Sequence, residues 1–260
     1  GNEQEVIGSA LFAPLSEPEA TSVQNSVFDI AIMKHSTEAE RRTTVGLLRI
    51  DELPFDPIRR RDSMLVRAHG KMILVMRGSP ENVWSVADFG MSKEAREWAT
   101  SEGKKGCRVL AIAWKEVHEA TSTLSEEDES NVHVVGMIAF ADPLKPSAFT
   151  AVANARELGV QVKIITGDAR EVAGWVGFSA GILTNPSEVI TGDELDKLSP
   201  DEKIAAVERY HVFARTMPLQ KNEIIALLQK KHLVGFLGEG FNDAPALKTA
   251  HVGIAVSSAS

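Results

Sequence analysis

Cysteine, long apolar runs and excess positive charge are all scarce in this sequence, and each shortage excludes a class of protein. The single cysteine, Cys107, excludes a disulfide within the chain and is typical of a reducing compartment. The longest apolar run, residues 132–141, is about half of the roughly 20 residues that a membrane-spanning helix needs, so we expect it to form a buried strand. With 28 Lys and Arg against 36 Asp and Glu, the chain has no surplus of cations for a nucleic-acid backbone, which argues against a general nucleic-acid binder.

Targeting signals and low-complexity segments are absent as well. The first five residues, Gly-Asn-Glu-Gln-Glu, are polar and acidic, unlike the start of a signal peptide. Because the chain begins with Gly1 instead of Met, we expect a piece of a longer protein, and we expect that piece to be a soluble monomer. Its 260 residues are enough for two modest domains.

Short strand-like segments dominate the first half. Each is rich in Val, Ile, Leu or Met and is bounded by Gly, Pro or charged turns, which favours an antiparallel sheet with a few helices. We expect a hairpin at His69-Gly70 and an irregular surface loop over the Ser-, Thr- and acid-rich residues 121–131. The expected strands cover residues 45–50, 63–68, 71–76, 108–114 and 133–140, and the expected helices cover residues 23–35 and 93–105.

A different pattern begins near Asp142-Pro143, where helices alternate with continuous apolar strands. Strands that are apolar on both faces and lead into helices are typical of a parallel, doubly wound α/β sheet. In such sheets ligands bind beyond the carboxyl ends of the strands, so polar residues there are candidates for function. The expected strands cover residues 160–165, 233–237 and 252–256, and the expected helices cover residues 147–158, 171–180, 218–231 and 244–249.

One polar cluster follows the strand that ends near residue 237. Glu239, Asn242 and Asp243 lie within five residues, behind two glycines that allow a sharp turn. Carboxylates held in this way can ligate Mg²⁺, which prefers oxygen ligands and keeps several waters. The alternative is a polar turn in which Asp243 is the N-cap of the following helix, ahead of Ala244 and Pro245.

Two further segments carry candidate phosphate-binding groups. Thr166, Gly167 and Asp168 end an apolar strand and combine a hydroxyl, a flexible residue and a carboxylate, although they could equally form an ordinary strand-to-helix turn. Lys221 lies in the first turn of an expected helix, where the helix dipole disfavours a cation, so it is a candidate partner for an anion. A solvated surface lysine is the simpler alternative.

Four segments in this order resemble the phosphorylation domain of P-type cation-transporting ATPases, within the haloacid dehalogenase-like superfamily. They are Asp142-Pro143-Leu144-Lys145, residues 164–168 (Ile-Ile-Thr-Gly-Asp), residues 213–221 (Phe-Ala-Arg-Thr-Met-Pro-Leu-Gln-Lys) and residues 238–247 (Gly-Glu-Gly-Phe-Asn-Asp-Ala-Pro-Ala-Leu). The resemblance implies a Rossmann-like phosphorylation domain over residues 141–260, incomplete at its N-terminal strand. It implies catalytic roles for Thr166, Gly167, Asp168, Lys221, Asn242 and Asp243, with Glu239 and Asp243 as Mg²⁺ ligands.

The first half is similar to the nucleotide-binding domain of the same family, expected over residues 1–140. The matching segments are residues 53–61 (Leu-Pro-Phe-Asp-Pro-Ile-Arg-Arg-Arg), residues 77–81 (Arg-Gly-Ser-Pro-Glu) and residues 106–113 (Gly-Cys-Arg-Val-Leu-Ala-Ile-Ala). The resemblance implies that Phe55 stacks on adenine and that one arginine of Arg59, Arg60 and Arg61 reaches the phosphates. We assign this role to Arg60 and leave the other two as alternatives. Arg77, Gly78, Arg108 and Asp142 would also belong to the ATP site. Structural alternatives exist as well: Phe55 could be a core aromatic, residues 59–61 a solvated turn and Gly78 a hairpin glycine.

Three departures from the family pattern affect these expectations. Arg77 replaces a lysine, Ala169 replaces an asparagine found in many relatives, and Glu239 replaces an aspartate of the Mg²⁺ site. Glutamate is one methylene longer, and Mg²⁺ tolerates poor octahedral geometry badly. The family's phosphorylated aspartate, in the motif Asp-Lys-Thr-Gly-Thr, does not occur anywhere in the sequence.

The expected function is therefore that of a fragment of an integral membrane ATPase, located at the cytoplasmic face of a membrane. It would bind ATP or ADP with Mg²⁺, while membrane helices not present here would move the cation. Residues 53–56 with the following arginines and residues 234–238 most resemble the magnesium-transporting branch, with the proton-pumping branch as the alternative. A superfamily phosphatase with residues 53–140 as its cap would need an Asp-x-Asp motif near the N-terminus, which is absent. A regulatory nucleotide-binding module is the non-enzymatic alternative.

Overall fold

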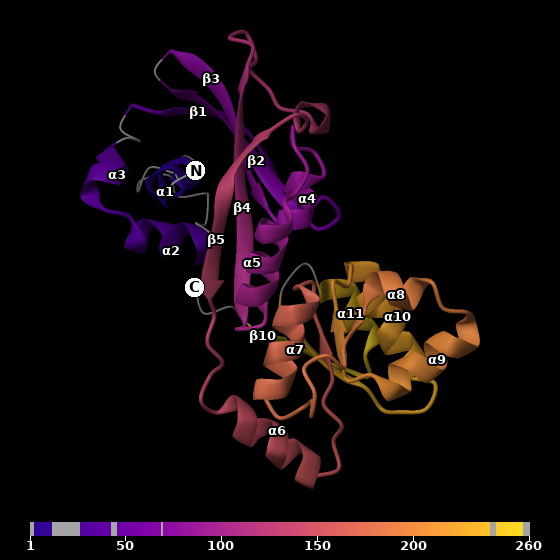
Figure 1. The fold of residues 1–260 in the computed structure, drawn as a ribbon. Coiled ribbons are helices and arrows are strands. Elements are labelled where there is room, and N and C mark those ends of the chain that lie inside the picture. Colours follow the sequence, from indigo (N-terminus) through magenta and orange to yellow (C-terminus); the bar gives the residue numbers. More distant parts are fainter. Residues whose placement is uncertain (1–2, 12–26, 43–45, 69, 240–242, 257–260) are drawn as a thin grey trace. The chain divides into compact units, whose positions relative to one another are not determined.

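The computed structural model describes residues 3–11, 27–42, 46–68, 70–239 and 243–256 (Figure 1). Contacts divide the chain into two compact units. The first unit contains Gly1–Glu102 and Val109–Ala141, and the second contains Gly103–Arg108 and Asp142–Ser260. No helix in the described ranges is long and apolar enough to span a membrane.

The first unit is built on a five-stranded sheet whose strand order follows the sequence, β1-β2-β3-β4-β5. The pairs β1–β2, β2–β3 and β3–β4 are antiparallel, and Ala68 pairs with Lys71, which confirms the expected hairpin; His69 itself lies outside the described residues. The elements are α1 (Glu3–Ala10), α2 (Val27–His35), α3 (Glu38–Arg42), β1 (Leu48–Asp56), β2 (Arg61–Ala68), β3 (Lys71–Gly78), α4 (Pro80–Trp84), α5 (Lys93–Gly103), β4 (Cys107–Val117), the 3₁₀ turn η1 (Glu126–Asp128) and β5 (His133–Ala141).

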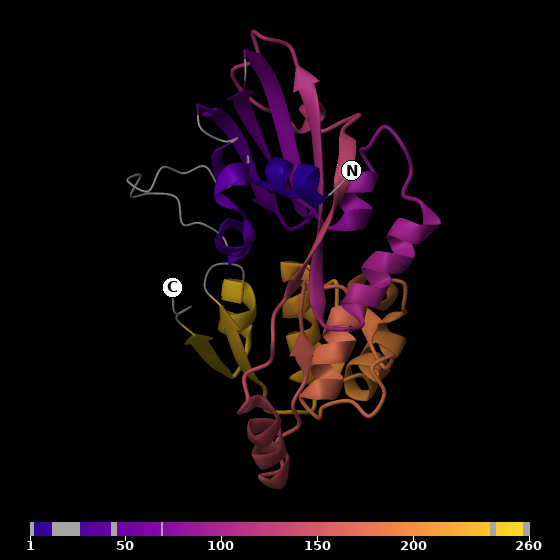
Figure 2. The same cartoon turned by 60° about the vertical axis from the view of Figure 1, so that its left-hand side comes forward.

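Side chains alternate between the two faces of this sheet, as the pleat requires. On one face Ile112 and Val135 pack with Val6 of α1 and Ile32 of α2. On the other face β3 and β4 pack against α4, through Leu74, Met76, Ala111, Ala113 and Val83. The indigo helices and α4 accordingly lie on opposite sides of the sheet in Figure 1 and Figure 2.

The second unit contains two parallel sheets, one with the order β6-β8-β7 and one that pairs β10 with β9. Together with the antiparallel sheet of the first unit they confirm the expected mixed α/β class. The elements are α6 (Ala148–Glu157), β6 (Ile164–Ile165), α7 (Arg170–Ser179), β7 (Ile190–Thr191), α8 (Gly192–Asp196), α9 (Pro200–Arg209), β8 (Val212–Ala214), α10 (Pro218–Leu228), β9 (Gly235–Glu239), α11 (Ala244–Thr249) and β10 (Val252–Val256).

Helices cover both faces of the three-stranded sheet. Val212 and Ala214 of β8 face Ala173 of α7, whereas Phe213 between them faces Val207 of α9 and Ile224 of α10. This alternation is the doubly wound arrangement that the continuous apolar strands predict. It leaves the carboxyl ends of the strands open to the loops that follow them.

Several predicted boundaries were wrong. Strand β1 begins and ends later than expected because it is an exposed edge strand containing Pro54, without an apolar alternation to mark it. Strand β6 is two residues long instead of six, since its hydrogen-bonded partner β8 has only three residues. The elements that were not predicted are strands β7 and β8 and helices α1, α3, α4, α8 and α9.

Candidate functional site

The loop after β6 forms a compact hydroxyl–carboxylate turn. The Thr166 hydroxyl donates to Asp168 Oδ2 at 3.1 Å and accepts from the Asp168 amide at 3.1 Å. The Asp168 side chain is 28% exposed, so its carboxylate is accessible to a ligand. The turn therefore presents one hydroxyl and one carboxylate at a strand end, in the place that the sequence predicted.

The loop after β8 braces this turn through the backbone. The Arg215 amide donates to the Asp168 carbonyl at 2.9 Å, and the Thr216 amide donates to the Thr166 carbonyl at 3.0 Å. The buried Thr216 hydroxyl donates to the same Thr166 carbonyl at 2.9 Å. Two loops from neighbouring strands are thus fixed to each other, so the Thr166–Asp168 turn is preorganised. Thr216 was not among the predicted site residues.

Lys221 and Asp243 form an ion pair that joins α10 to the start of α11. Their Nζ and Oδ1 atoms are 2.7 Å apart, and their side chains are only 16% and 12% exposed. Asp243 occupies the N-cap position of α11, but its side chain makes no capping hydrogen bond. The predicted alternative of a simple helix cap is therefore not what the carboxylate does. A Cβ on Gly238 would lie 2.8 Å from the Asp243 side chain, so only glycine lets this carboxylate approach β9.

The predicted Mg²⁺ ligands are partly outside the described residues. Asn242 is one of the residues that the structure does not describe, and so is the side chain of Glu239, whose backbone ends β9. In the described part of the chain, no three acidic, His or Cys side chains form a metal-binding cluster. Mg²⁺ is commonly held by one or two carboxylates together with waters and substrate phosphates, so the oxygen donor of Asp243 fits this ion.

Arg108 and Asp142, both predicted to contact nucleotide, lie near Asp168 within the second unit. Arg108 Nη2 is 3.2 Å from Asp168 Oδ2, and Nη1 is 3.7 Å from Asp142 Oδ2. The Arg108 and Asp142 side chains are 38% and 64% exposed, so these pairs contribute little to stability. An exposed guanidinium between two carboxylates is available to a polyanionic ligand.

Phe55 and Arg60 lie at the end of β1 and in the turn that follows it. Phe55 is 62% exposed, which excludes the alternative that it is a core aromatic. Arg60 has a positive φ of 52°, an uncommon conformation for a side-chain-bearing residue, and the Ser79 amide donates to its carbonyl at 3.0 Å. A Cβ on Gly78 would lie 2.5 Å from this same carbonyl, so glycine is required for the backbone contact.

Arg77 is buried between two carboxylates. Its Nε donates to Asp62 at 2.8 Å from the neighbouring strand, and Nη1 donates to Asp29 of α2. Burial raises the pKa of the Asp62 carboxyl, and the charge of Arg77 offsets part of that effect. The guanidinium holds α2 against the sheet, and its predicted role at a nucleotide remains a prediction.

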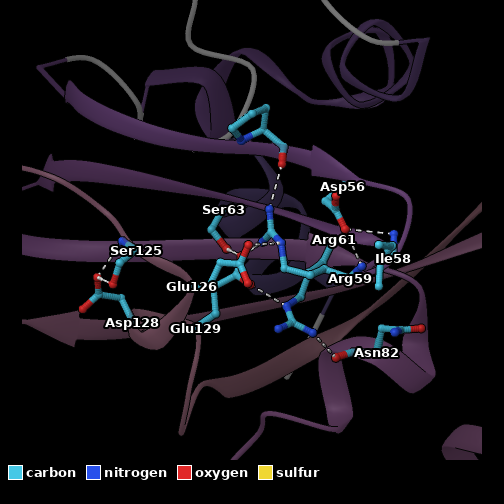
Figure 3. Close-up of polar contacts among 11 residues, drawn as sticks. Asp56, Ile58, Arg59, Arg61, Ser63, Asn82, Ser125, Glu126, Asp128 and Glu129 are labelled. Atoms are coloured by element: carbon cyan, nitrogen blue, oxygen red, sulfur yellow. Dashed lines mark hydrogen bonds and ion pairs between the residues drawn. The ribbon is translucent and has the colours of Figure 1, made fainter. Parts of the chain in front are cut away.

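A buried carboxylate that sequence reasoning missed, Glu129, lies next to Arg59 and Arg61 at the turn after β1 (Figure 3). Glu129 is fully buried in the segment predicted as a surface loop, and it accepts hydrogen bonds from Arg59, Arg61 and Ser63. Burial opposes its ionisation, but these three donors outweigh burial and hold the pKa of the Glu129 carboxyl below its usual value. The run of three consecutive arginines was the available signal, because closely spaced cations that are not solvated need a counterion.

Comparisons with known proteins agree with the fold. Residues 67–251 match the haloacid dehalogenase-like hydrolase family. The chain is 38% identical over 96% of its length to the magnesium-transporting ATPase, P-type 1, of Salmonella typhimurium, and 33% identical over 92% to that of Escherichia coli. It is 31% identical over 81% of its length to calcium-transporting ATPase 1 of Lactococcus lactis.

These matches cover only part of each relative: 29%, 28% and 25% of the three proteins. The chain therefore spans less than a third of the length of these relatives. Within that span it belongs to the haloacid dehalogenase-like hydrolase family and is similar to P-type magnesium- and calcium-transporting ATPases.

Proposed function

We propose that the chain is the ATP-handling part of a P-type cation-transporting ATPase. The observation that carries the proposal is the strand-end arrangement of the second unit. There the Thr166–Asp168 turn is held by the loop after β8, and Lys221 is paired with Asp243 at 2.7 Å. The similarity to transporting ATPases over nearly the whole chain supports it.

The residues of the second unit would act on the phosphoryl group. Thr166 and Asp168 would hold its oxygens, and Lys221 would offset its negative charge, which is how proteins lower most of the barrier to phosphoryl transfer. Asn242 would fix the loop ahead of Asp243. The acceptor would be an aspartate outside this chain, because the sequence contains no Asp-Lys-Thr-Gly-Thr.

Magnesium would be held by Asp243 and Glu239. When bound, it would supply positive charge that neutralises the oxygens of the transferred group. Lys221 already neutralises Asp243 without the ion, so metal binding requires this ion pair to loosen or to share the carboxylate.

The first unit would bind the nucleotide. Phe55 would stack on adenine, Gly78 would let the backbone approach closely, and Arg60 would contact the phosphates. Arg77 would shape the adenosine pocket from its buried position, while Arg108 and Asp142 would act on the phosphates.

The whole protein would couple ATP hydrolysis to cation movement through membrane helices, with this part at the cytoplasmic face. Magnesium is the proposed cation, because two of the relatives are magnesium-transporting ATPases. Calcium is the second candidate, since the Lactococcus lactis relative is a calcium-transporting ATPase.

Calorimetric titration of the chain with Mg²⁺ and ATP tests the nucleotide site. We expect Phe55→Ala and Arg108→Ala each to raise the Kd about tenfold, because they remove a stacking contact and a charged hydrogen bond. Phe89→Ala is the matched control, since Phe89 is a comparably exposed aromatic (75%) in the same unit. Titrations that Phe55→Ala and Arg108→Ala both leave unchanged would contradict the proposal.

A further inference from the structure

The Glu129 carboxylate is a fully paired charge inside the first unit (Figure 3). Arg59 Nη1 donates to Oε1 at 2.6 Å, Arg61 Nε donates to Oε2 at 2.8 Å, and the Ser63 hydroxyl donates to Oε1 at 2.7 Å. The Arg59 and Arg61 side chains are 12% and 11% exposed, and that of Glu129 is 0% exposed. Charge-assisted hydrogen bonds away from water are short and directional, so this group holds both guanidinium planes in fixed positions.

The two arginines also donate to backbone carbonyls in different elements. Arg59 Nη2 donates to the carbonyl of Pro54 at 3.1 Å, at the end of β1. Arg61 Nη1 donates to the carbonyl of Asn82 at 3.2 Å, in α4. Of these two guanidinium groups, only that of Arg59 reaches the backbone next to Phe55. Arg61 also pairs with Asp56 in the β1–β2 ladder, but through its backbone, which Arg61→Lys leaves in place.

Phe55 is held by its backbone and not by packing. The residue is 62% exposed, so packing by neighbouring side chains does little to fix its ring. On one side of Phe55, the Arg59 side chain donates to the Pro54 carbonyl. On the other side, Asp56 Oδ1 accepts from the Arg59 amide at 2.7 Å, and the Asp56 carbonyl accepts from the Arg60 amide at 2.6 Å. The β1–β2 pairs Leu53–Ser63 and Asp56–Arg61 flank Phe55, and the register shifts between them. Within this irregular stretch, the Arg59 contacts are what set the direction in which the ring leaves the strand.

We propose that Glu129 is a positioning residue for Phe55, acting through Arg59 and the Pro54 carbonyl. This rests on the proposed function, in which Phe55 stacks on adenine. The buried carboxylate orients Arg59, Arg59 fixes the strand end, and the strand end aims the ring. The Arg61 side chain also donates to Glu129, but its other hydrogen bond goes to α4, so it does not orient the Phe55 ring.

Arg59→Lys and Arg61→Lys form a matched pair for the test. Each keeps a positive charge near Glu129, and each removes one guanidinium branch. Two quantities are measured on the full chain with Mg²⁺ and ATP by NMR titration: the Kd, and the ring-current shift of the adenine protons at saturation. The shift reports ring placement, which a general loss of stability does not change in the molecules that remain folded.

Stacking of a base on an aromatic side chain is worth roughly five- to 150-fold in affinity. We expect Arg59→Lys to raise the Kd for ATP about fivefold and to reduce the adenine shift, and Arg61→Lys to leave both near wild type. Ser63→Ala removes only the hydroxyl that shares Oε1 with Arg59, so it should shift both quantities in the same direction by less. It also serves if Arg59→Lys does not fold.

Phe55→Ala distinguishes the proposal that Phe55 stacks on adenine from the proposal that Glu129 and Arg59 position Phe55. If it leaves the Kd and the adenine shift unchanged, the proposed function of Phe55 is wrong. If it abolishes the shift while the two lysine variants behave alike, Phe55 stacks on adenine but Glu129 and Arg59 do not position it.

Discussion

At the scale of single residues, Glu129 is expected to make the fold less stable as the pH falls into the acid range. Its carboxyl has a pKa below the ordinary value of 4.5, because the hydrogen bonds from Arg59, Ser63 and Arg61 outweigh burial. A lowered carboxyl pKa stabilises the fold above pH 4.5, and that contribution is lost as the pH falls below 4.5 through the folded-state pKa.

We expect Glu129→Gln to destabilise the first unit by about 3 kcal/mol at pH 7, since it leaves two arginines without their buried counterion. The variant should also lose part of the decrease in stability that occurs as the pH falls below 4.5. Urea unfolding at several pH values measures both effects. Glu116→Gln, in an exposed ion pair with Lys71, is the control and should change stability by less than about 1 kcal/mol.

Gly78 is a position where the absence of a side chain matters for stability. A Cβ at this position would lie 2.5 Å from the Arg60 carbonyl, and backbone cannot move aside easily. We expect Gly78→Ala to destabilise the chain by about 1–3 kcal/mol, as overpacking does. Gly90→Ala, where a Cβ would meet nothing within 4 Å, should stay within about 0.5 kcal/mol of wild type in the same thermal or urea unfolding.

At the scale of elements, the two loops that follow β6 and β8 act as one structure. Three hydrogen bonds join them, and one comes from the buried Thr216 hydroxyl. We expect Thr216→Val, which keeps the shape but removes that donor, to cost about 1 kcal/mol. Urea unfolding measures the loss, and the exposed Thr123→Val is the control. A neutral Thr216→Val would show that the backbone bonds alone fix the Thr166–Asp168 turn.

The accuracy of the predicted element boundaries depended on how strong a hydrophobic pattern each element has. Strands β3 and β5 were predicted within a few residues because they are apolar and bounded by turns. Strand β8 was missed because three residues cannot show a period, although all three are buried. Segment 121–131 was misassigned as surface only, because an acidic residue in a polar run gives no local sign that it is buried.

At the scale of the whole molecule, each unit has its own hydrophobic core. We therefore expect the proposed nucleotide residues of the first unit and the proposed phosphoryl-group residues of the second unit to be positioned by separate cores. The chain lacks the sequence Asp-Lys-Thr-Gly-Thr, so we expect no acid-stable phosphoprotein after incubation with labelled ATP and Mg²⁺. Autoradiography of the acid-quenched protein measures this, with a full-length transporting ATPase as the positive control. A labelled band from this chain would contradict the assignment of the acceptor to another segment.

Hydrophobic periodicity and glycine-marked loops are local properties, so the fold class and the strand-end position of Thr166 and Asp168 could be predicted without the structure. The sequence also placed Lys221 and Asp243 in the same family pattern, but it left open whether Asp243 caps a helix. The folded structure was needed to see that this carboxylate pairs with Lys221 and that Glu129 pairs with Arg59 and Arg61. Those contacts join residues 22 to 70 positions apart, and the partner of a buried charge is set by packing in three dimensions and not by neighbouring residues.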